Sequence, residues 1–368
     1  MRTPLVFSAL FVLAVACDNT PVAPTAPVGP SPTPTDPRSL AAYVPPVSTD
    51  EWETVSPAAL GWDTTALNTA LTFAGQQQST GVVILWRGRV AAERYWNGWT
   101  PTKDSIIASA GKSVTSFLIG QLHEQGRLDI TRPATTYLGA GWSRSPTSEP
   151  RITVRHLLSM SSGLDDSLRF VLEPGVRFYY NNPAYYQTFD LITRATGQTL
   201  SAVSNSLLFS RIGMRTASWR FNVDAGEPGF VLSCSTRDMA RYGLLVLNRG
   251  RWGSQTLLAD SAYFNASVNS SQTSNPSYGF LWWLNGKPSY RIPGPYVLPN
   301  VTGSLIPSAP TDLIAALGKG DKKIYVIPSL ELVVVRHGNE ADASGGNPLA
   351  VSTFDEQFWQ RLRVALKY

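Results

Sequence analysis

The chain has 368 residues, of which 43% are hydrophobic and only 15% are charged, and it carries a net charge of +5. A chain this apolar can bury a sizeable core, which excludes an intrinsically disordered protein. The positive charge forms neither a Lys/Arg run nor an alternation of basic and aromatic residues, so we expect no nucleic-acid partner.

Cysteine and histidine usage argues against a metalloprotein. The two cysteines, Cys17 and Cys234, are too few for a disulfide framework. The three histidines show neither a His-x-x-x-His spacing nor a Cys/His cluster of the kind that binds zinc. We therefore expect no metal and no other cofactor.

The first 17 residues have the pattern of an export signal. A short basic start precedes an apolar run over residues 5–16, which is too short to span a bilayer as a permanent helix. The run ends in Leu13-Ala14-Val15-Ala16-Cys17, which resembles the lipobox of bacterial lipoproteins. Cys17 is then the lipidated N-terminus of an exported protein, held to the cell envelope by acyl chains. Ordinary cleavage near Ala16 and secretion is the alternative.

Residues 18–49 are predicted to be a linker. Prolines alternate there with Thr, Ala, Val and Ser, so the segment cannot bury enough apolar surface to fold and its prolines keep it extended. This linker would hold a catalytic domain, expected over residues 50–368, away from the membrane.

The domain begins with a predicted helix over residues 62–75 and a β-hairpin over residues 81–96, with its turn at Arg87-Gly88. A buried helix is expected to begin close to Ser109. A short helix is expected to begin after its cap Thr153 and to end at Gly163. More helices are expected over 183–197, 199–209, 236–248 and 259–268, strands over 313–318, 323–327 and 331–336, and a last helix over 354–366. This order predicts an α+β lobe with an all-helical lobe inserted at about 116–270, and a cleft between the lobes.

The helix near Ser109 carries the first candidate site. Val114, Phe117 and Leu122 recur on it at helical spacing. Ser109 and Lys112 lie three residues apart, so they share a face, and the amine can reach the hydroxyl it would deprotonate. Free N–H groups at a helix N-terminus favour a developing oxyanion. The structural alternative is a solvated serine and lysine in a first helical turn.

Residues 173–186 form the second candidate element. Pro183 fits the first position of a helix with Asn182 as its cap, which leaves Tyr180 in the preceding loop. The Tyr180 phenol can relay the Ser109 proton to a leaving group, and Asn182 can hydrogen-bond to Lys112 or to substrate. Equally, Asn182 can serve only as a cap, and Tyr180 only as a packing residue.

Together these motifs resemble the serine β-lactamase and penicillin-binding-protein superfamily, in the branch with class C β-lactamases, D-alanyl-D-alanine peptidases, esterases and 6-aminohexanoate-dimer hydrolases. Ser109-Ala110-Gly111-Lys112 matches its Ser-x-x-Lys motif and Tyr180-Asn181-Asn182 its Tyr-x-Asn motif. Four further segments also resemble sequences of this superfamily, namely residues 153–164, 212–214, 278–283 and 324–335. The resemblance therefore covers about residues 60–365. It implies a β-lactamase/transpeptidase-like fold with an antiparallel sheet flanked by helices.

The third motif of that superfamily, Lys-Thr-Gly or His-x-Gly, is altered. Ala316-Leu317-Gly318 stands in its place and keeps only Gly318. The resemblance implies that the lost basic residue would hold a substrate carboxylate, so penicillins and D-Ala-D-Ala peptides become less favoured substrates. The N–H of Lys319 can still pair with that of Ser109 as an oxyanion hole. For the Lys319 side chain we prefer a plain turn lysine.

We therefore expect a serine hydrolase that cleaves a small ester, amide or peptide through an acyl-Ser109 intermediate, with an uncharged Lys112 as base and Tyr180 as acid. A Ser-His-Asp enzyme fits less well, because no Gly-x-Ser-x-Gly elbow is found and His123, His156 and His337 are expected to be structural. The alternative from another class is a catalytically weak, tethered module that binds cell-wall peptide or a protein partner.

Overall fold

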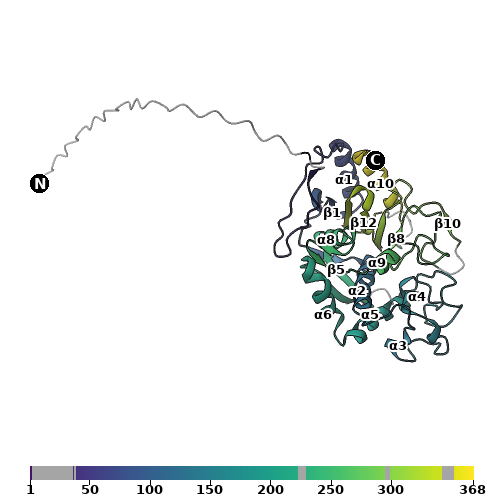
Figure 1. The fold of residues 1–368 in the computed structure, drawn as a ribbon. Helices are drawn as coiled ribbons and strands as arrows, with labels where there is room; N and C mark the ends of the chain where they lie inside the picture. Colours follow the sequence, from purple (N-terminus) through teal and green to yellow (C-terminus); the bar gives the residue numbers. More distant parts are fainter. Residues whose placement is uncertain (2–35, 37–38, 223–228, 295–298, 342–351) are drawn as a thin grey trace. The chain divides into compact units, whose positions relative to one another are not determined.

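The computed structural model describes residues 1, 36, 39–222, 229–294, 299–341 and 352–368, and the fold is that of residues 39–368 (Figure 1). The signal peptide, Cys17 and most of the predicted linker lie outside the described residues. None of the helices in the described ranges is long and apolar enough to cross a bilayer.

The centre of the fold is a six-stranded antiparallel sheet in the order β2-β1-β13-β12-β11-β8. Its strands are β1 (Ser79–Trp86), β2 (Arg89–Tyr95), β8 (Trp283–Leu284), β11 (Ile314–Gly318), β12 (Lys322–Ile327) and β13 (Leu332–Gly338). The central strands are buried on both sides and read as continuous apolar runs. The expected α+β class with an antiparallel sheet is confirmed.

Helices cover both faces of this sheet (Figure 1). Neighbouring residues of a strand point to opposite faces. On β12, Ile324 lies under Gly243 of α8 (Thr236–Leu247), whereas the ring of Tyr325 packs on Trp359 of α10 (Thr353–Leu366). α1 (Thr64–Gln76) packs beside α10, with Phe73 stacked on Phe354 at 5.9 Å. α8 therefore covers one face of the sheet, and α1 and α10 cover the other.

The predicted β-hairpin is confirmed and holds the upstream chain. Arg87 and Gly88 both have positive φ, as a two-residue hairpin turn requires. The carbonyl of Arg87 accepts the Tyr43 N–H at 2.9 Å, and the Arg89 guanidinium donates to the Ala41 carbonyl at 2.6 Å. Residues 40–49, which the sequence analysis assigns to the linker, thus include chain that is hydrogen-bonded to the folded body.

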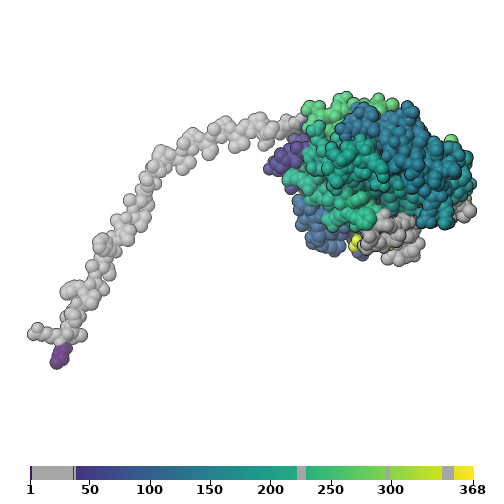
Figure 2. Space-filling model, turned by 90° about the horizontal axis from the view of Figure 1, so that it is seen from below, coloured from purple at the N-terminus to yellow at the C-terminus, as the bar shows by residue number. Residues whose placement is uncertain are grey.

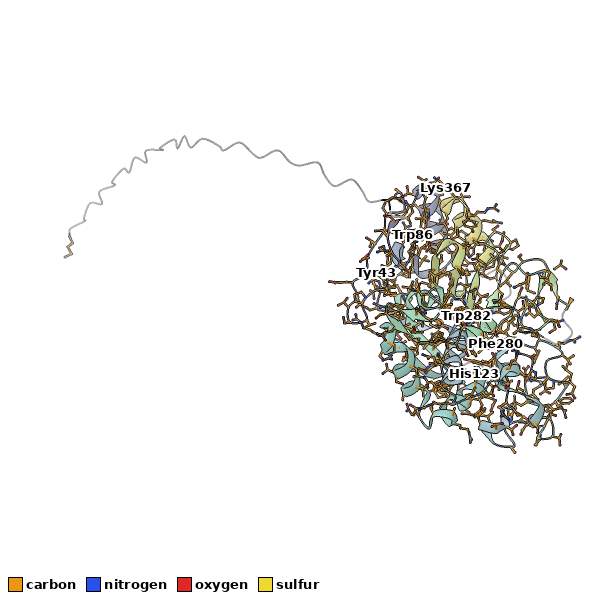
Figure 3. The ribbon with its side chains drawn as sticks, viewed as in Figure 1. Tyr43, Trp86, His123, Phe280, Trp282 and Lys367 are labelled. Atoms are coloured by element: carbon orange, nitrogen blue, oxygen red, sulfur yellow. The ribbon has the colours of Figure 1, made fainter. Side chains whose placement is uncertain are left out.

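α2 (Lys112–Glu124) is the most enclosed helix of the fold, since all its residues from Lys112 to Leu122 are buried. Tyr242 of α8 and Tyr263 of α9 (Ser261–Ser267) each donate a hydroxyl to a backbone carbonyl of α2, at 2.6 and 2.7 Å. The Tyr263 ring also contacts His123 and Phe280, with centroids 5.9 and 5.8 Å away; His123 and Phe280 are labelled in Figure 3. The prediction of a buried helix after Ser109 is confirmed, and the hydrogen bonds from Tyr242 and Tyr263 fix the position of α2.

The inserted stretch over about residues 116–270 contains strands as well as helices, so the lobe that was predicted to be all-helical is not; one of its strands also pairs with β3, which precedes the stretch. β3 (Asp104–Ile106), β5 (Gly229–Ser235) and β4 (Ser218–Asn222) form a three-stranded antiparallel sheet, and β6 (Arg251–Trp252) pairs with β7 (Gln255–Thr256). Besides α2, α8 and α9, the helices of the stretch are α3 (Thr135–Leu138), α4 (Val154–Leu158), α5 (Asn182–Thr196), α6 (Leu200–Ser204) and α7 (Ser210–Ile212), with a π-helical turn at Asn205–Phe209. The residues of this stretch form much of the surface in Figure 2, coloured from blue through teal to green. β9 (Ser289–Tyr290) and β10 (Val301–Thr302) form a further pair.

One helix is shorter than expected. Thr153 caps α4 in a capping box with His156, as the sequence indicates, but the helix ends at Leu158 and not at Gly163. Met160 has a φ of +53°, which breaks the helical path three residues before Gly163, whose own φ is +76°. Residues 159–163 are thus a turn that leads toward Tyr180.

Candidate active site

Ser109 lies in a short 3₁₀ helix, Ala108–Gly111, that leads directly into α2; we call it the Ser109 turn. The Ile107 N–H donates to the Leu232 carbonyl of β5 at 2.8 Å, which fixes the start of the turn. Ala108 has a φ of +48°, an unfavourable value for a residue with a Cβ. The turn thus combines a constrained backbone with a serine that is partly exposed.

Lys112 meets Ser109 as the spacing predicts. Its Nζ donates to Ser109 Oγ at 3.0 Å, although the lysine side chain is only 6% exposed. The same Nζ lies 5.2 Å from the ring centroid of Tyr180 and 4.3 Å from that of Tyr185. Aromatic faces stabilise a positive charge, so the two rings can stabilise the charge that develops on the amine while it takes up a proton from Ser109.

Tyr180 joins the same group. Its phenol hydrogen-bonds to the Ser109 side chain, and its ring stacks on Trp283 with centroids 6.2 Å apart. Burial raises the pKa of Tyr180 above its ordinary value, and the bond to Ser109 offsets this only in part. The residue is therefore a neutral phenol at neutral pH, able to donate a proton and not present as phenolate.

The helix cap is one residue earlier than predicted. Asn181, not Asn182, is the N-cap of α5: its side-chain oxygen accepts the Ala184 N–H at 2.8 Å, and its Nδ2 donates to the Leu164 carbonyl at 2.8 Å. Asn182 is the first residue of the helix, with Pro183 next to it. The prediction that Asn182 caps α5 is therefore wrong, because the side chain of Asn181 accepts the Ala184 N–H.

β11 brings the altered third motif against the Ser109 turn. A Cβ on Gly318 would lie 2.3 Å from the Ile107 carbonyl oxygen and 3.1 Å from the Ala110 nitrogen, so only glycine allows this approach. Ala316 shares the Gly318 side of the strand and presents a buried methyl group there. Lys319, exposed, follows directly at the end of β11.

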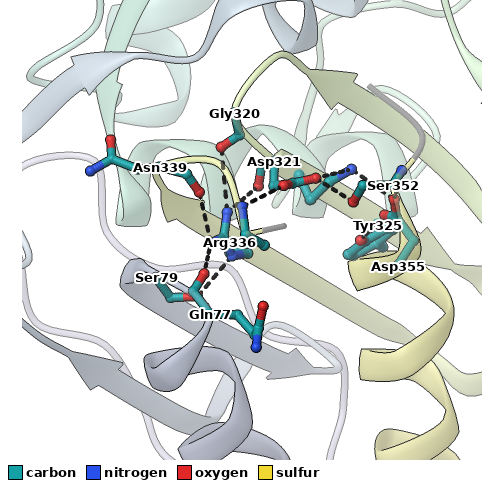
Figure 4. Close-up of polar contacts among 11 residues, drawn as sticks. Gln77, Ser79, Gly320, Asp321, Tyr325, Arg336, Asn339, Ser352 and Asp355 are labelled. Atoms are coloured by element: carbon teal, nitrogen blue, oxygen red, sulfur yellow. Dashed lines mark hydrogen bonds and ion pairs between the residues drawn. The ribbon is translucent and has the colours of Figure 1, made fainter. Parts of the chain in front are cut away.

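Buried charges hold the chain immediately after Lys319 (Figure 4). Asp321 accepts the Ser352 hydroxyl at 2.6 Å and lies 3.1 Å from Lys323 Nζ, which also bonds Asp355 at 2.8 Å. Burial is the largest single influence on Asp321 and opposes its ionisation, but Lys323, the hydrogen bonds from Ser352 and Ala341 and the charge of Arg336 together lower the pKa of this carboxyl. Arg336 donates to the Asp321 carbonyl at 2.6 Å. The turn between β11 and β12 is therefore fixed from its inner side.

The histidines stand apart from this group. His123 Nδ1 lies 3.0 Å from the Leu128 carbonyl, His156 accepts the Thr153 N–H at 3.1 Å, and His337 Nε2 lies 3.3 Å from the Ser105 carbonyl. Among the described residues, no group of three or more His, Cys, Asp or Glu is placed to hold a metal ion.

Two contributions to the site were missed at the sequence level. Tyr185 lies against the lysine amine and bonds Thr115 of α2, with the two oxygens 2.9 Å apart. The sequence feature that could have indicated this role is the position of Tyr185 on α5, five residues after Tyr180. β5, which holds the Ser109 turn through Leu232, was missed altogether.

The Beta-lactamase family profile matches residues 66–345 of the chain. The chain belongs to the beta-lactamase family. This beta-lactamase family protein is therefore a hydrolase of the serine β-lactamase and penicillin-binding-protein superfamily, as its motifs indicate.

Relatives of the beta-lactamase family protein agree with this placement. It is 22% identical to a 6-aminohexanoate-dimer hydrolase of Paenarthrobacter ureafaciens over 274 residues, which is 60% of this chain and 68% of that protein. The structure of a candidate 6-aminohexanoate-dimer hydrolase from Bacillus anthracis matches with a TM-score of 0.63, 19% identity and 80% coverage of each chain. A candidate beta-lactamase from Bacteroides dorei matches with a TM-score of 0.66 at 16% identity, over 83% of this chain and all of that one. The fold is thus shared at low identity.

Proposed function

We propose that the protein hydrolyses small esters or linear amides through an acyl-enzyme on Ser109. The observation that carries this proposal is the 3.0 Å bond between Lys112 Nζ and Ser109 Oγ inside a buried aromatic setting. A lysine enclosed in this way beside a partly exposed hydroxyl has the arrangement of a base and its nucleophile.

In the proposed acylation step, Ser109 Oγ attacks the substrate carbonyl carbon and its proton passes to Lys112 Nζ, directly or through Tyr180. The main-chain N–H groups of Ser109 and Lys319 bind the resulting oxyanion. When the bond to the leaving group breaks, the neutral Tyr180 phenol protonates the leaving atom and regains its proton from Lys112. Water then attacks the acyl-enzyme and releases the carboxylic acid and free Ser109. Asn182 is proposed to contact substrate.

An ester or amide is preferred over a β-lactam because of Ala316. A buried methyl group stands on the strand face where the superfamily motif has a basic residue, so no cation from that position can hold a substrate carboxylate. The relative from Paenarthrobacter ureafaciens is named for hydrolysis of the 6-aminohexanoate dimer, which is a linear amide. That dimer is therefore a reasonable test substrate.

The test compares the parent with Ser109→Ala on p-nitrophenyl esters, the 6-aminohexanoate dimer and a chromogenic cephalosporin. Ser201→Ala, at an exposed serine of α6, is the control. We expect turnover of esters or the dimer by the parent and the control, and none by Ser109→Ala. Equal turnover by all three, or absence of turnover with no labelling of Ser109 by a fluorophosphonate, would refute the proposal and favour the tethered binding module.

We also propose that Cys17 is lipidated and anchors the enzyme to the cell envelope. Expression of the full chain in a bacterium, followed by detergent phase partitioning, tests this. The parent should enter the detergent phase and Cys17→Ala the aqueous phase. Recovery of the parent in the aqueous phase would favour ordinary cleavage near Ala16.

A further inference from the structure

Two phenylalanines on the small sheet form an exposed aromatic pair. Phe221 of β4 and Phe230 of β5 are direct cross-strand partners, and their rings meet edge to face with centroids 5.4 Å apart. Phe221 is 62% exposed and Phe230 is 36% exposed. Adjoining aromatic rings left open to water present apolar area that a bound apolar group would remove from solvent.

This pair lies on the sheet face that supports the Ser109 turn. Phe230 and Leu232 are two residues apart on β5, so their side chains share a face and are separated by about 7 Å along the strand. Leu232 contacts the turn directly, since a Cβ on Gly111 would lie 3.0 Å from Leu232 Cβ. The pair is therefore the solvent-exposed end of the apolar face against which the turn packs.

A row of rings on α5 joins the pair to Lys112. Tyr185 lies 4.3 Å from the lysine amine, its ring is 5.1 Å from Phe189, and Phe189 is 5.6 Å from Phe230. Tyr186 extends the row, and Gly229 makes room for it, because a Cβ at residue 229 would lie 2.6 Å from the Tyr186 ring. Ring contacts are thus continuous from the amine to the exposed pair, through the buried rings of Tyr185 and Phe189.

Among the described residues of β4 and β5, none on the face of the aromatic pair is charged. Arg220 precedes Phe221 on β4 but points to the other face, where it bonds Asp104. The leaving atom of a substrate must meet the Tyr180 hydroxyl, whose ring packs against Trp283. Trp283 belongs to β8 of the six-stranded sheet, whereas the exposed pair lies on the small sheet, which holds the Ser109 turn through Leu232, and this favours the acyl half of the substrate as the ligand of the pair.

We propose that Phe221 and Phe230 are specificity-determining residues that bind an apolar acyl chain of the ester or amide cleaved at Ser109. This inference rests on the proposed function and names its substrate class, which is medium-chain or aryl acyl groups in preference to acetyl. Each fully buried methylene would raise kcat/KM about fourfold, and the partial exposure of the pair reduces that gain.

The experiment measures kcat/KM for p-nitrophenyl acetate, butyrate, hexanoate and octanoate, which share one leaving group. The readout is the ratio of octanoate to acetate in the parent, Phe221→Ser, Phe230→Leu and the double variant. Val364→Ser is the matched control, because Val364 of α10 is also 62% exposed. Circular dichroism melting of each variant identifies any loss of folding.

We expect a ratio of about ten or more in the parent and in Val364→Ser, and a ratio near one in the folded double variant. A flat profile in the parent, or an equal ratio in parent and double variant, would overturn the inference. A chain-length dependence found only in a series of alkyl acetates would place the apolar group on the leaving side and would also overturn it. The proposed function fails separately, if Ser109→Ala hydrolyses the acetate as fast as the parent.

Discussion

Gly318 of β11 lies so close to Ile107 that a Cβ on residue 318 would come within 2.3 Å of the Ile107 carbonyl oxygen. This backbone-to-backbone contact joins the end of a central strand to the turn that carries Ser109. We propose that this contact positions the N–H of the following residue, Lys319, to bind the oxyanion.

Gly318→Ala is expected to separate β11 from the Ser109 turn and to lower kcat for ester hydrolysis about 10²-fold or more, because loss of one oxyanion donor has an effect of that size. Gly98→Ala is the control: Gly98 has a φ of +67° with open space around it, so its substitution strains the backbone without a collision. Comparable melting temperatures with a selective loss of activity in Gly318→Ala would support the contact. Full activity in Gly318→Ala would contradict it.

Tyr180→Phe should lower kcat for the 6-aminohexanoate dimer by about 10²- to 10⁴-fold, the usual contribution of a positioned proton donor. The effect on p-nitrophenyl esters should be smaller, because nitrophenolate leaves without protonation. Steady-state kinetics on both substrates check this. An equal loss on both substrates would mean that the phenol does not act as the acid for the leaving group.

His337 should make stability depend on pH. It is 1% exposed, and burial lowers its pKa to about 4 from 6.5. Between these values the unfolded chain binds a proton at residue 337 and the folded chain does not, so the free energy of unfolding falls as the pH is lowered from about 6.5 to 4, by about 3 kcal/mol from this group. Urea titrations of the parent and His337→Gln from pH 4 to 8 test this. The same pH slope in both proteins would exclude His337 as its source.

Lys323→Met should destabilise the fold by about 3–5 kcal/mol, because it leaves the buried carboxylates of Asp321 and Asp355 without their shared cation. Arg132→Met removes an exposed ion pair to Asp129, with 69% and 43% of the two side chains exposed, and should cost less than about 1 kcal/mol. Guanidinium denaturation measures both. Equal, small losses would show that the network contributes little to stability.

The sequence predicted those helices and turns whose residue patterns lie within a few neighbouring positions of the chain. Val114, Phe117 and Leu122 lie at helical spacing in a helix that is buried nearly all round, and Arg87-Gly88 supplies the backbone of a hairpin turn. The Ser109–Lys112 contact follows from the same spacing, because the 3₁₀ turn and α2 are continuous.

Long-range pairing was not predictable in this way. β3 has only three residues, and Ser105 pairs with Cys234, far away in the sequence. A short segment of this kind has no periodicity to detect, and its partner is defined only when the chain folds. The cap of α5 was misplaced by one residue because Asn181 and Asn182 can both cap a helix, and Pro183 fits its first or second position equally.

The central claim is that Ser109 forms a covalent acyl intermediate with Lys112 as its base. The direct measurement is intact-protein and peptide mass spectrometry after rapid quenching with p-nitrophenyl butyrate. The account predicts a butyryl increment on the peptide that contains Ser109 in the parent, at least 10³-fold slower formation in Lys112→Met, and none in Ser109→Ala. Product release by the parent with no adduct on Ser109 and unchanged rates in both variants would contradict it.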